Sequence, residues 1–498
     1  MLTRFSLALP LLLVTLTPLL AANPSAEKKT FRAGAYAQDV TPKKFPISVN
    51  GNMSDVQARR ASDPLHARCL VLDDGTTQVA FCVVDSCMLP RPITDEARRL
   101  AAKATGIPAG HILVSATHTH TAPTAGGVFQ SEPDADYIKQ LPVLIARGIA
   151  QAAANRAAAR IGWGSGSNPR QVFNRRWHRE HALIPRDPFG RTTDKVQMNP
   201  GYQAPGLLKP AGPIDPTVSV LSVQALDGRP IALLANYSLH YVGGIEALSA
   251  DYFGAFAERV KDRLGAREGA PAFVGIMSNG TSGDINNVNF AGPLPKGRQA
   301  GEQLRDVAAD VARTAVETYR TIAHRDWVPL AAATAEIELG VRLPDEKDLE
   351  RAREVLARAK GPVLRGLEEV YARETVLIAK YPPRVKLLLQ AIRVGDLGIC
   401  AVPCEVFVEI GLELRKRSPL KDTFTIELAN GYNGYLPTPE QHRLGGYETW
   451  RARSSYLEAD ASTAITRTLL GLLDRVHKAT VSGPVTPPTR RRGSRPVR

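Results

Sequence analysis

Short runs of apolar residues, each about the length of one strand, recur along the chain. Val79–Val84 is apolar throughout and ends at Asp85, and Ile112–Ser115 and Ala272–Ile276 are similar runs. A strand that is apolar on both faces is typical of the buried interior of an α/β sheet. We therefore expect buried strands at these three places and at Phe424–Leu428.

Two pairs of apolar runs are separated by turn residues. The turn of the first pair is Asp227-Gly228, and that of the second pair is Gly395-Asp396. Asp and Gly are favoured in tight hairpin turns because they tolerate left-handed backbone angles. We therefore expect two antiparallel hairpins, over residues 218–237 and 385–402.

Seven longer segments have apolar residues at the three-to-four-residue spacing of a helix. The segment 345–360 is the clearest amphipathic case, because its apolar residues form one stripe among charged residues. We expect it to lie on the surface with one face packed against the domain. The other six segments are Ile93–Ala104, Tyr137–Ala154, Tyr252–Leu264, Gln299–Tyr319, Val406–Arg417 and Ser462–His477.

Strands and helices alternate along most of the chain, and the hairpins interrupt that alternation. Parallel strands need helical crossovers, whereas hairpins add antiparallel strands. The order therefore predicts the α/β fold class, as a single large mixed-sheet domain with flanking helices and inserted hairpins. No internal repeat or linker divides residues 34–477, which we expect to form one domain.

The N-terminus has the pattern of an export signal. Arg4 supplies the positive charge, Leu7–Leu20 is almost wholly apolar, and Ala21 and Ala22 are small residues suited to a cleavage site. The apolar run is short for a membrane span, which needs ~20 residues. We expect residues 1–22 to be a signal peptide, residues 23–33 a linker and the protein to be secreted or periplasmic. An uncleaved N-terminal anchor is the alternative.

The formal net charge is +14, and part of it lies in the segment 478–498. A basic, Pro-rich segment buries too little apolar surface to fold, so we expect a disordered tail. Its charge suits contact with an anionic membrane or envelope polymer. The tail has no aromatic residues for base stacking, so no specific nucleic acid is expected as a partner. Its arginines are Arg490, Arg491, Arg492, Arg495 and Arg498.

The five cysteines do not indicate a disulfide scaffold. Their odd number leaves at least one thiol free. Cys69, Cys82 and Cys400 lie in apolar runs typical of strands, which favours buried free thiols.

The sharpest chemical motif is Thr-His-Thr-His, in which the histidines are His118 and His120. It follows an apolar strand, and loops at the carboxyl ends of strands hold the sites of α/β proteins. Two histidines at this spacing can direct both imidazoles toward one metal ion, although such pairs also occur in ordinary loops. The metallo-β-lactamase pattern is excluded because Ala122 stands where that pattern has an aspartate.

Two further residues could bind a metal. His240 follows the run 231–237, and Glu405 follows the apolar run 399–402. A carboxylate in such surroundings must be paired, coordinated or shifted in pKa. Each residue also has an ordinary interpretation. A histidine at a strand end often makes a structural hydrogen bond, and a glutamate can stabilise a helix N-terminus.

Three glycine-rich segments follow apolar strands. Residues 279–287 form a polar loop whose amides could face an oxyanion. Residues 430–438 and 445–448 place tyrosines among glycines. Residues 279–287 are also compatible with a plain turn, and the tyrosines of the other two segments could cap the edge of the core with their hydroxyls in water.

These segments occur together in one order, and in that combination the chain resembles the catalytic domain of the neutral/alkaline, non-lysosomal ceramidases. The resemblance extends from about Gly34 to about Leu473. It implies one zinc ion per chain, held by two histidines, a glutamate and a tyrosine. Matched by motif, these ligands are His118, His240, Glu405 and Tyr435.

The resemblance also implies catalytic roles for neighbouring residues. His120 is expected beside the metal, Arg175 matches a substrate-binding arginine, and Tyr447 matches a tyrosine that helps to bind the scissile amide. Zinc polarises a carbonyl and lowers the pKa of bound water toward ~7, while His120 and Tyr447 can donate to an oxyanion. The implied activity is zinc-dependent hydrolysis of an amide bond in a small-molecule or lipid N-acyl substrate, with ceramide as a candidate.

One catalytic position departs from the family pattern. The family has a serine, the assigned nucleophile, where this chain has Asn286. An amide cannot act as a hydroxyl nucleophile, so either a metal-bound water attacks directly or the substrate is not ceramide. Two alternatives stay open. One is a non-catalytic relative that binds an envelope lipid or glycan. The other is a zinc esterase or lactonase, whose reaction shares the tetrahedral oxyanion.

Overall fold

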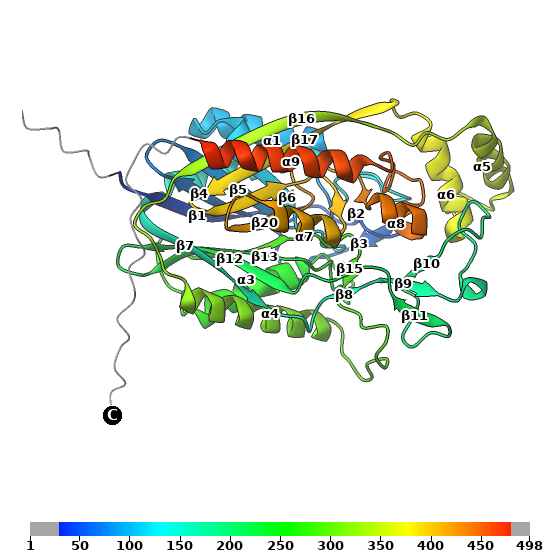
Figure 1. Cartoon of the computed structure of the whole chain (residues 1–498), viewed down its shortest axis with the longest axis horizontal. Coiled ribbons are helices and arrows are strands. Elements are labelled where there is room, and N and C mark those ends of the chain that lie inside the picture. Colours follow the sequence, from blue (N-terminus) through cyan, green and yellow to red (C-terminus); the bar gives the residue numbers. More distant parts are fainter. Residues whose placement is uncertain (1–28, 480–498) are drawn as a thin grey trace, which may run out of the picture.

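The computed structural model describes residues 29–479 and confirms the α/β class (Figure 1). The predicted signal peptide, most of the predicted linker and nearly all of the predicted tail lie outside the described residues. The largest sheet has eight strands. In sheet order they are β14 (Val274–Asn279), β13 (Pro230–Tyr237), β12 (Thr217–Ala225), β7 (Ala157–Ser167), β1 (Arg32–Asp39), β4 (His66–Asp73), β5 (Gln78–Val84) and β6 (Ile112–Ala116).

A second sheet packs against the inner face of the first. Alternate residues of β5 show why the run is apolar throughout: Phe81 points into the core between the two sheets, whereas Cys82 points into the core under the helices. Ile392 and Ile399 of the second sheet share the inner core with Phe81. The strands of the second sheet are, in order, β16 (Leu330–Gly340), β17 (Arg384–Val394), β18 (Leu397–Ala401) and β20 (Asp422–Ile426).

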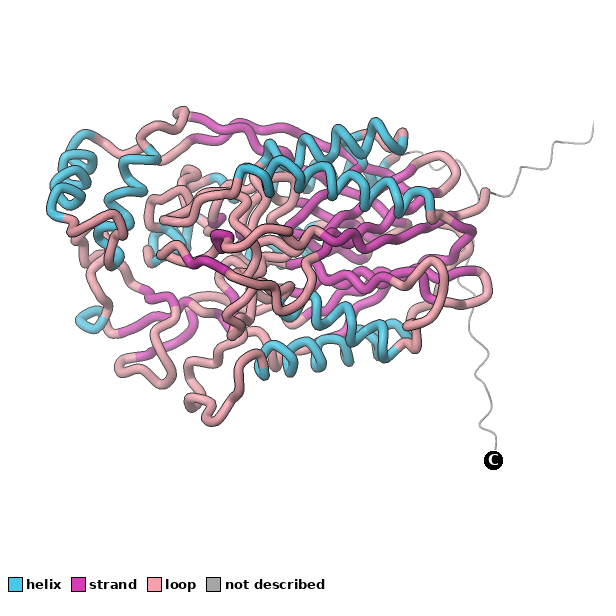
Figure 2. The backbone as a smooth tube through the Cα atoms, turned by 180° about the vertical axis from the view of Figure 1, so that it is seen from behind, coloured by secondary structure: helices cyan, strands magenta, loops and turns pink. Residues whose placement is uncertain are grey.

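Helices cover both outer faces, which gives four layers. Figure 1 shows α9 on one side of the two sheets and α3 and α4 on the other, and Figure 2 shows the same arrangement from behind. The apolar faces of α1 and α2 pack on one half of the large sheet, those of α3 and α4 on its other half, and those of α7 and α9 on the second sheet. These helices are α1 (Arg91–Thr105), α2 (Ala135–Ala154), α3 (Asp251–Arg263), α4 (Glu302–Thr321), α7 (Val408–Arg417) and α9 (Ala461–Lys478).

Shorter elements gather at one end of the layers, on the right in Figure 1. They include the helices α5 (Glu346–Arg358), α6 (Gly366–Ile378) and α8 (Pro439–Leu444). The short strands are β2 (Ile47–Val49), β3 (Val56–Ala58), β8 (Phe173–Asn174), β9 (Arg176–Arg179), β10 (Val196–Met198), β11 (Leu207–Pro210), β15 (Ile285–Asn286), β19 (Glu405–Val406) and β21 (Tyr435–Leu436). Two 3₁₀ turns are η2 (His181–Leu183) and η3 (Tyr447–Thr449). The third, η1 (Ala109–His111), directly precedes β6.

Three parallel strand pairs direct their carboxyl ends to the same end of the molecule. The pairs are β5 with β6, β13 with β14, and β18 with β20. The backbone N–H of Ala116, the last residue of β6, donates to Leu428 O, after β20, at 3.1 Å. Glu427 N donates to Asn279 O, at the end of β14, at 3.2 Å. These bonds bring the loops that follow all three pairs together.

Several sequence predictions are confirmed and others need correction. Both hairpins form, as β12–β13 and β17–β18, but the second belongs to a separate sheet. The predicted linker is too long, because β1 begins at Arg32 and Phe31 is buried. The predicted helix Val406–Arg417 begins at Val408, because Val406 belongs to β19, which pairs with β21. The helix α6 was not predicted, because its apolar residues have little periodicity.

The cysteine prediction is also confirmed. All five thiols are free and buried. Within residues 29–479, no helix is both long and apolar enough to cross a membrane.

Candidate metal centre

The loop after β6 places His118 in the centre of the candidate site. Its φ angle is +76°, in the left-handed region that non-glycine residues rarely adopt. The backbone N–H of His118 donates to Ser86 O at 2.9 Å, which ties the loop to the one after β5. Strained backbone of this kind is concentrated at functional sites.

Two histidines direct their Nε2 nitrogens at the same point. Nδ1 of His118 donates to Cys87 O at 2.7 Å, and Nδ1 of His240 donates to Ser282 O at 3.1 Å. With the ring proton on Nδ1, the other nitrogen carries a lone pair. The two Nε2 atoms lie 3.0 Å apart. Two lone pairs that face each other at this distance repel, so either a proton or a metal cation must lie between the two nitrogens.

Glu405 completes this group. Its Oε2 lies 3.3 Å from Nε2 of His118, is buried and accepts no hydrogen bond, whereas its Oε1 accepts one from the hydroxyl of Tyr432 at 2.9 Å. The ligands of one tetrahedral zinc ion are about 3.3 Å apart when each lies about 2.0–2.1 Å from the metal. The arrangement of His118, His240 and Glu405 therefore fits a divalent cation.

Glu405 and His118 each stabilise the charged form of the other. Burial disfavours ionisation of Glu405, but His118 and Arg175 outweigh burial and lower the pKa of its carboxyl. Burial likewise disfavours a charged His118, but Glu405 raises the pKa of that imidazole well above its ordinary value. Burial, together with His118 and Arg175, lowers the pKa of His240. A metal ion bound here would take the place of the positive charge on His118 and balance the Glu405 carboxylate.

Tyr435 lies beside the three converging ligands. It is opposite Glu405 in the parallel pair of β19 with β21, and it is buried. The guanidinium carbon of Arg175 lies 5.4 Å from the centre of its ring. Burial and the nearby Glu405 raise the pKa of the Tyr435 hydroxyl well above its ordinary value. The role of Tyr435 as a fourth ligand stays a prediction.

His120 also reaches the group. Its Nε2 lies 3.2 Å from Nε2 of His118, and its ring stacks on Tyr241 with ring centres 3.7 Å apart. Burial and the nearby His118 lower the pKa of His120, which favours the neutral ring. A neutral imidazole can accept or donate one proton at a bound substrate.

Gly51 lies against the ring of His120, so we predict that Gly51→Ala moves this histidine. Gly51 has a φ angle of +95°, and a Cβ there would lie 2.3 Å from Nδ1 of His120. We expect a fall in kcat/KM of about 10–100-fold, as for a misplaced acid–base group. Metal content should stay unchanged. Kinetic assays and metal analysis check this prediction.

Gly75→Ala is the matched control for that prediction. Gly75 has a similar φ angle of +85°, but the nearest heavy atom to its Cβ position is 4.0 Å away. An equal loss of activity in both variants would contradict a specific effect on His120.

Arg175 is held rigidly next to the histidines. Its Nε donates to Glu448 at 3.0 Å and its Nη2 to Gly283 O at 2.8 Å. Its Nη1 lies 3.3 Å from Nε2 of His240. Burial opposes the charge, but Tyr435 and Glu448 outweigh burial and raise the pKa of the guanidinium. A fixed positive charge at this place can bind the oxygen of a substrate or an oxyanion.

Tyr447 borders the group from the turn η3. Its ring centre lies 5.7 Å from that of Tyr435 and 5.9 Å from that of Trp450, both edge to face. Gly446 precedes it with a φ angle of +88°. The side chain of Tyr447 remains partly exposed, so a substrate could reach it.

Asn286 lies in β15, and its amide is used to fix the local backbone. Its Nδ2 donates to Asn199 Oδ1 at 2.9 Å, and its Oδ1 accepts from Val288 N at 3.0 Å. The hydroxyl of Ser282 does not replace a nucleophile, because it donates to Glu427 at 2.6 Å and lies on the Nδ1 side of His240. Asn286 has no hydroxyl, and the hydroxyl of Ser282 does not face the Nε2 nitrogens of the two histidines.

Sequence reasoning missed Glu427. Its side chain is buried, and it accepts hydrogen bonds from Ser282, in the loop after β14 that contacts His240, and from Val406, next to Glu405. Burial raises the pKa of Glu427 to about 8, although Ser282 and His118 oppose that rise. A glutamate inside an apolar run was the available signal, as it was for Glu405.

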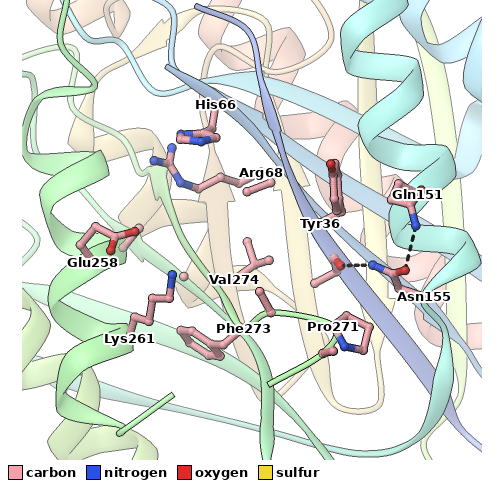
Figure 3. Close-up of a pocket in the computed structure, with 16 residues that line it drawn as sticks. Tyr36, His66, Arg68, Gln151, Asn155, Glu258, Lys261, Pro271, Phe273 and Val274 are labelled. Atoms are coloured by element: carbon pink, nitrogen blue, oxygen red, sulfur yellow. Dashed lines mark hydrogen bonds between the residues drawn. The ribbon is translucent and has the colours of Figure 1, made fainter. Parts of the chain in front are cut away.

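A large cavity lies elsewhere, between α2 and α3 (Figure 3). Its volume is about 590 Å³, and its lining includes Tyr36, His66, Arg68 and Lys261. Arg68 is paired with Asp85 at 2.5 Å, and His66 is the one histidine of the lining. We assign the chemistry to the converging histidines rather than to this cavity, because the cavity lacks a comparable group of ligands.

Comparison with solved structures identifies the fold. The chain is similar to the crystal structure of neutral ceramidase from Pseudomonas aeruginosa, with a TM-score of 0.69 and 16% identity over 93% of this chain and 77% of that chain. It is also similar to a ceramidase complexed with C2, with a TM-score of 0.67 and 16% identity over 93% and 78% of the two chains. No protein-family model and no curated protein matches the sequence. The resemblance found in the sequence is thus confirmed at the level of the fold.

Proposed function

We propose that this chain, which has the neutral ceramidase fold, is a zinc-dependent hydrolase that cleaves the amide bond of an N-acyl substrate. One observation carries the proposal: the lone pairs of His118 and His240 and the unpartnered oxygen of Glu405 converge at 3.0–3.3 Å. Two nitrogens and one carboxylate form a donor set that catalytic zinc sites use. Tyr435 is the proposed fourth ligand.

The remaining residues have roles in binding and proton transfer. A zinc ion bound by this set supplies Lewis acidity, which polarises a carbonyl and activates water. Arg175 stays charged and orients the carbonyl oxygen, and Tyr447 donates its hydroxyl proton to the developing oxyanion. His120 accepts a proton from the attacking water and returns it to the leaving amine.

The surroundings of the site favour an apolar acyl group. Tyr432, Tyr447 and Trp450 pack against a buried apolar cluster and keep part of their own surface exposed. An acyl chain would gain free energy by burial against such a surface. Ceramide is therefore a candidate, together with other N-acyl lipids and N-acyl amino acids.

A non-catalytic lipid-binding or glycan-binding protein is the second candidate. Asn286 favours it, because its amide is tied to Asn199 and Val288 and cannot serve as a nucleophile. A zinc esterase or lactonase would use the same residues on an ester. We also propose export to the envelope or the medium and contact of the basic tail with anionic surfaces.

Metal analysis combined with a substrate screen tests the proposal. We expect about one equivalent of zinc per purified chain, and hydrolysis of at least one N-acyl compound that stops with a chelator and resumes with zinc. N-acyl lipids, N-acyl amino acids and matching esters form the screen. Protein without zinc would overturn the metal-dependent mechanism, and zinc without any hydrolysis would favour the binding protein.

A further inference from the structure

We propose that Glu427 is a positioning residue, which holds two segments at the spacing that a metal ion requires. The first is the loop after β14, whose Ser282 contacts His240, and the second is the segment that carries Glu405. This inference rests on the proposed metal-dependent function. It adds a residue that forms no hydrogen bond with the side chain of any proposed ligand.

One carboxylate joins the two loops. Oε1 of Glu427 accepts from the Ser282 hydroxyl at 2.6 Å. Its Oε2 accepts from two backbone N–H groups, that of Ser282 at 3.2 Å and that of Val406 at 2.6 Å. All three donors lie in the buried interior, where Glu427 itself has no exposed surface.

Each loop passes the constraint directly to a ligand. The carbonyl of Ser282 accepts from Nδ1 of His240 at 3.1 Å, so the position of Ser282 sets the rotation of that imidazole. Val406 is bonded covalently to Glu405, and β19 holds both residues against β21. Glu427 is therefore linked to His240 by two hydrogen bonds through Ser282, and to Glu405 by one hydrogen bond to the next residue, Val406.

The position of Glu427 is itself fixed. It follows β20, and its backbone N–H donates to Asn279 O, at the end of β14, at 3.2 Å. The carboxylate thus stands between the ends of the two sheets, at the place where the ligand loops meet. Without an acceptor there, three buried donors would move toward other partners and carry the ligands with them.

Zinc affinity in a leucine variant tests this inference. Glu427→Leu replaces the carboxylate with an apolar side chain of similar size and so removes the hydrogen-bond acceptor. We expect the zinc dissociation constant, measured by competition with a chromogenic chelator, to rise about 10–100-fold, as is typical when a partner behind the ligands is lost. Glu427→Gln should stay within about threefold, because its carbonyl can accept from both N–H groups and its amide can donate to the Ser282 hydroxyl.

A control variant separates metal positioning from general stability. Glu374 is equally buried, but its carboxylate binds Arg453, at 2.7 Å from the guanidinium, and forms no hydrogen bond with Ser282 or Val406. Glu374→Leu should lower the melting temperature and leave the zinc dissociation constant unchanged. If Glu427→Leu does not fold, Glu427→Asp gives the same test, because its carboxylate is one methylene shorter and cannot reach both loops.

The outcomes distinguish the inference from the proposed function. Wild-type protein that binds no zinc would overturn the function. If Glu427→Leu or Glu427→Asp binds zinc as tightly as the wild type, the positioning role of Glu427 is overturned and the proposed function is unaffected. Equal weakening in the Glu374→Leu control would also overturn it.

Discussion

His118→Ala should remove zinc and activity together. His118 is the residue common to the short contacts of the centre, at 3.0 Å from His240, 3.2 Å from His120 and 3.3 Å from Glu405. Without it, one nitrogen and one carboxylate remain from the converging group, too few for a stable zinc site. We expect zinc to fall below about a tenth of an equivalent and kcat/KM to fall by about 10³-fold or more.

His111→Ala is the control for this change. His111 precedes β6, at the opposite end of the strand from His118, and its Nδ1 contacts Gln78 O at 3.0 Å. We expect normal zinc content and activity in this variant. Circular dichroism and metal analysis on both proteins check that His118→Ala loses metal rather than fold. A His118→Ala protein with full zinc content would show that the ligand assignment is wrong.

Arg175→Met should reduce activity without removing zinc. The guanidinium is buried beside the metal ligands, where its charge acts in surroundings of low polarity. Loss of one oxyanion-stabilising group lowers kcat by about 10²–10³-fold, so we expect a fall of that size in kcat/KM. Glu448 keeps a partner in Arg176, at 2.5 Å, which limits the damage to the fold.

Arg175→Lys distinguishes charge from geometry. A lysine keeps the charge but lacks the planar set of donors that now reaches Glu448 and Gly283 O. We expect its activity to lie between those of the wild type and Arg175→Met. Full activity of Arg175→Met, measured with saturating zinc, would exclude Arg175 from catalysis.

Part of the candidate site could be predicted from local sequence. The Thr-His-Thr-His motif follows an apolar strand, and a loop at a strand's carboxyl end is where α/β proteins place such residues. Glu405 was ambiguous, because a glutamate near a predicted helix could stabilise the helix N-terminus. The structure decides against that interpretation: Glu405 lies in β19, before the helix begins at Val408.

Other parts of the site have no local signal. The carbonyl of Cys87 fixes the tautomer of His118, and a backbone carbonyl leaves no trace in the sequence. Gly51 contacts His120 across a separation of about seventy residues, which no short-range pattern reveals. Glu427 resembles any buried glutamate until the loops around it are placed.

The sequence by itself determined most of the helices, both hairpins and several buried strands, because strand and helix periodicity reflects which faces are buried, and that is a local property. It also supplied the candidate ligands and the order in which they occur. Only the tertiary structure decided that the hairpin 385–402 belongs to a second sheet, since pairing between distant strands depends on packing rather than on either strand alone. It also decided that the loops after three parallel strand pairs meet, which brings His118, His240 and Glu405 to one point.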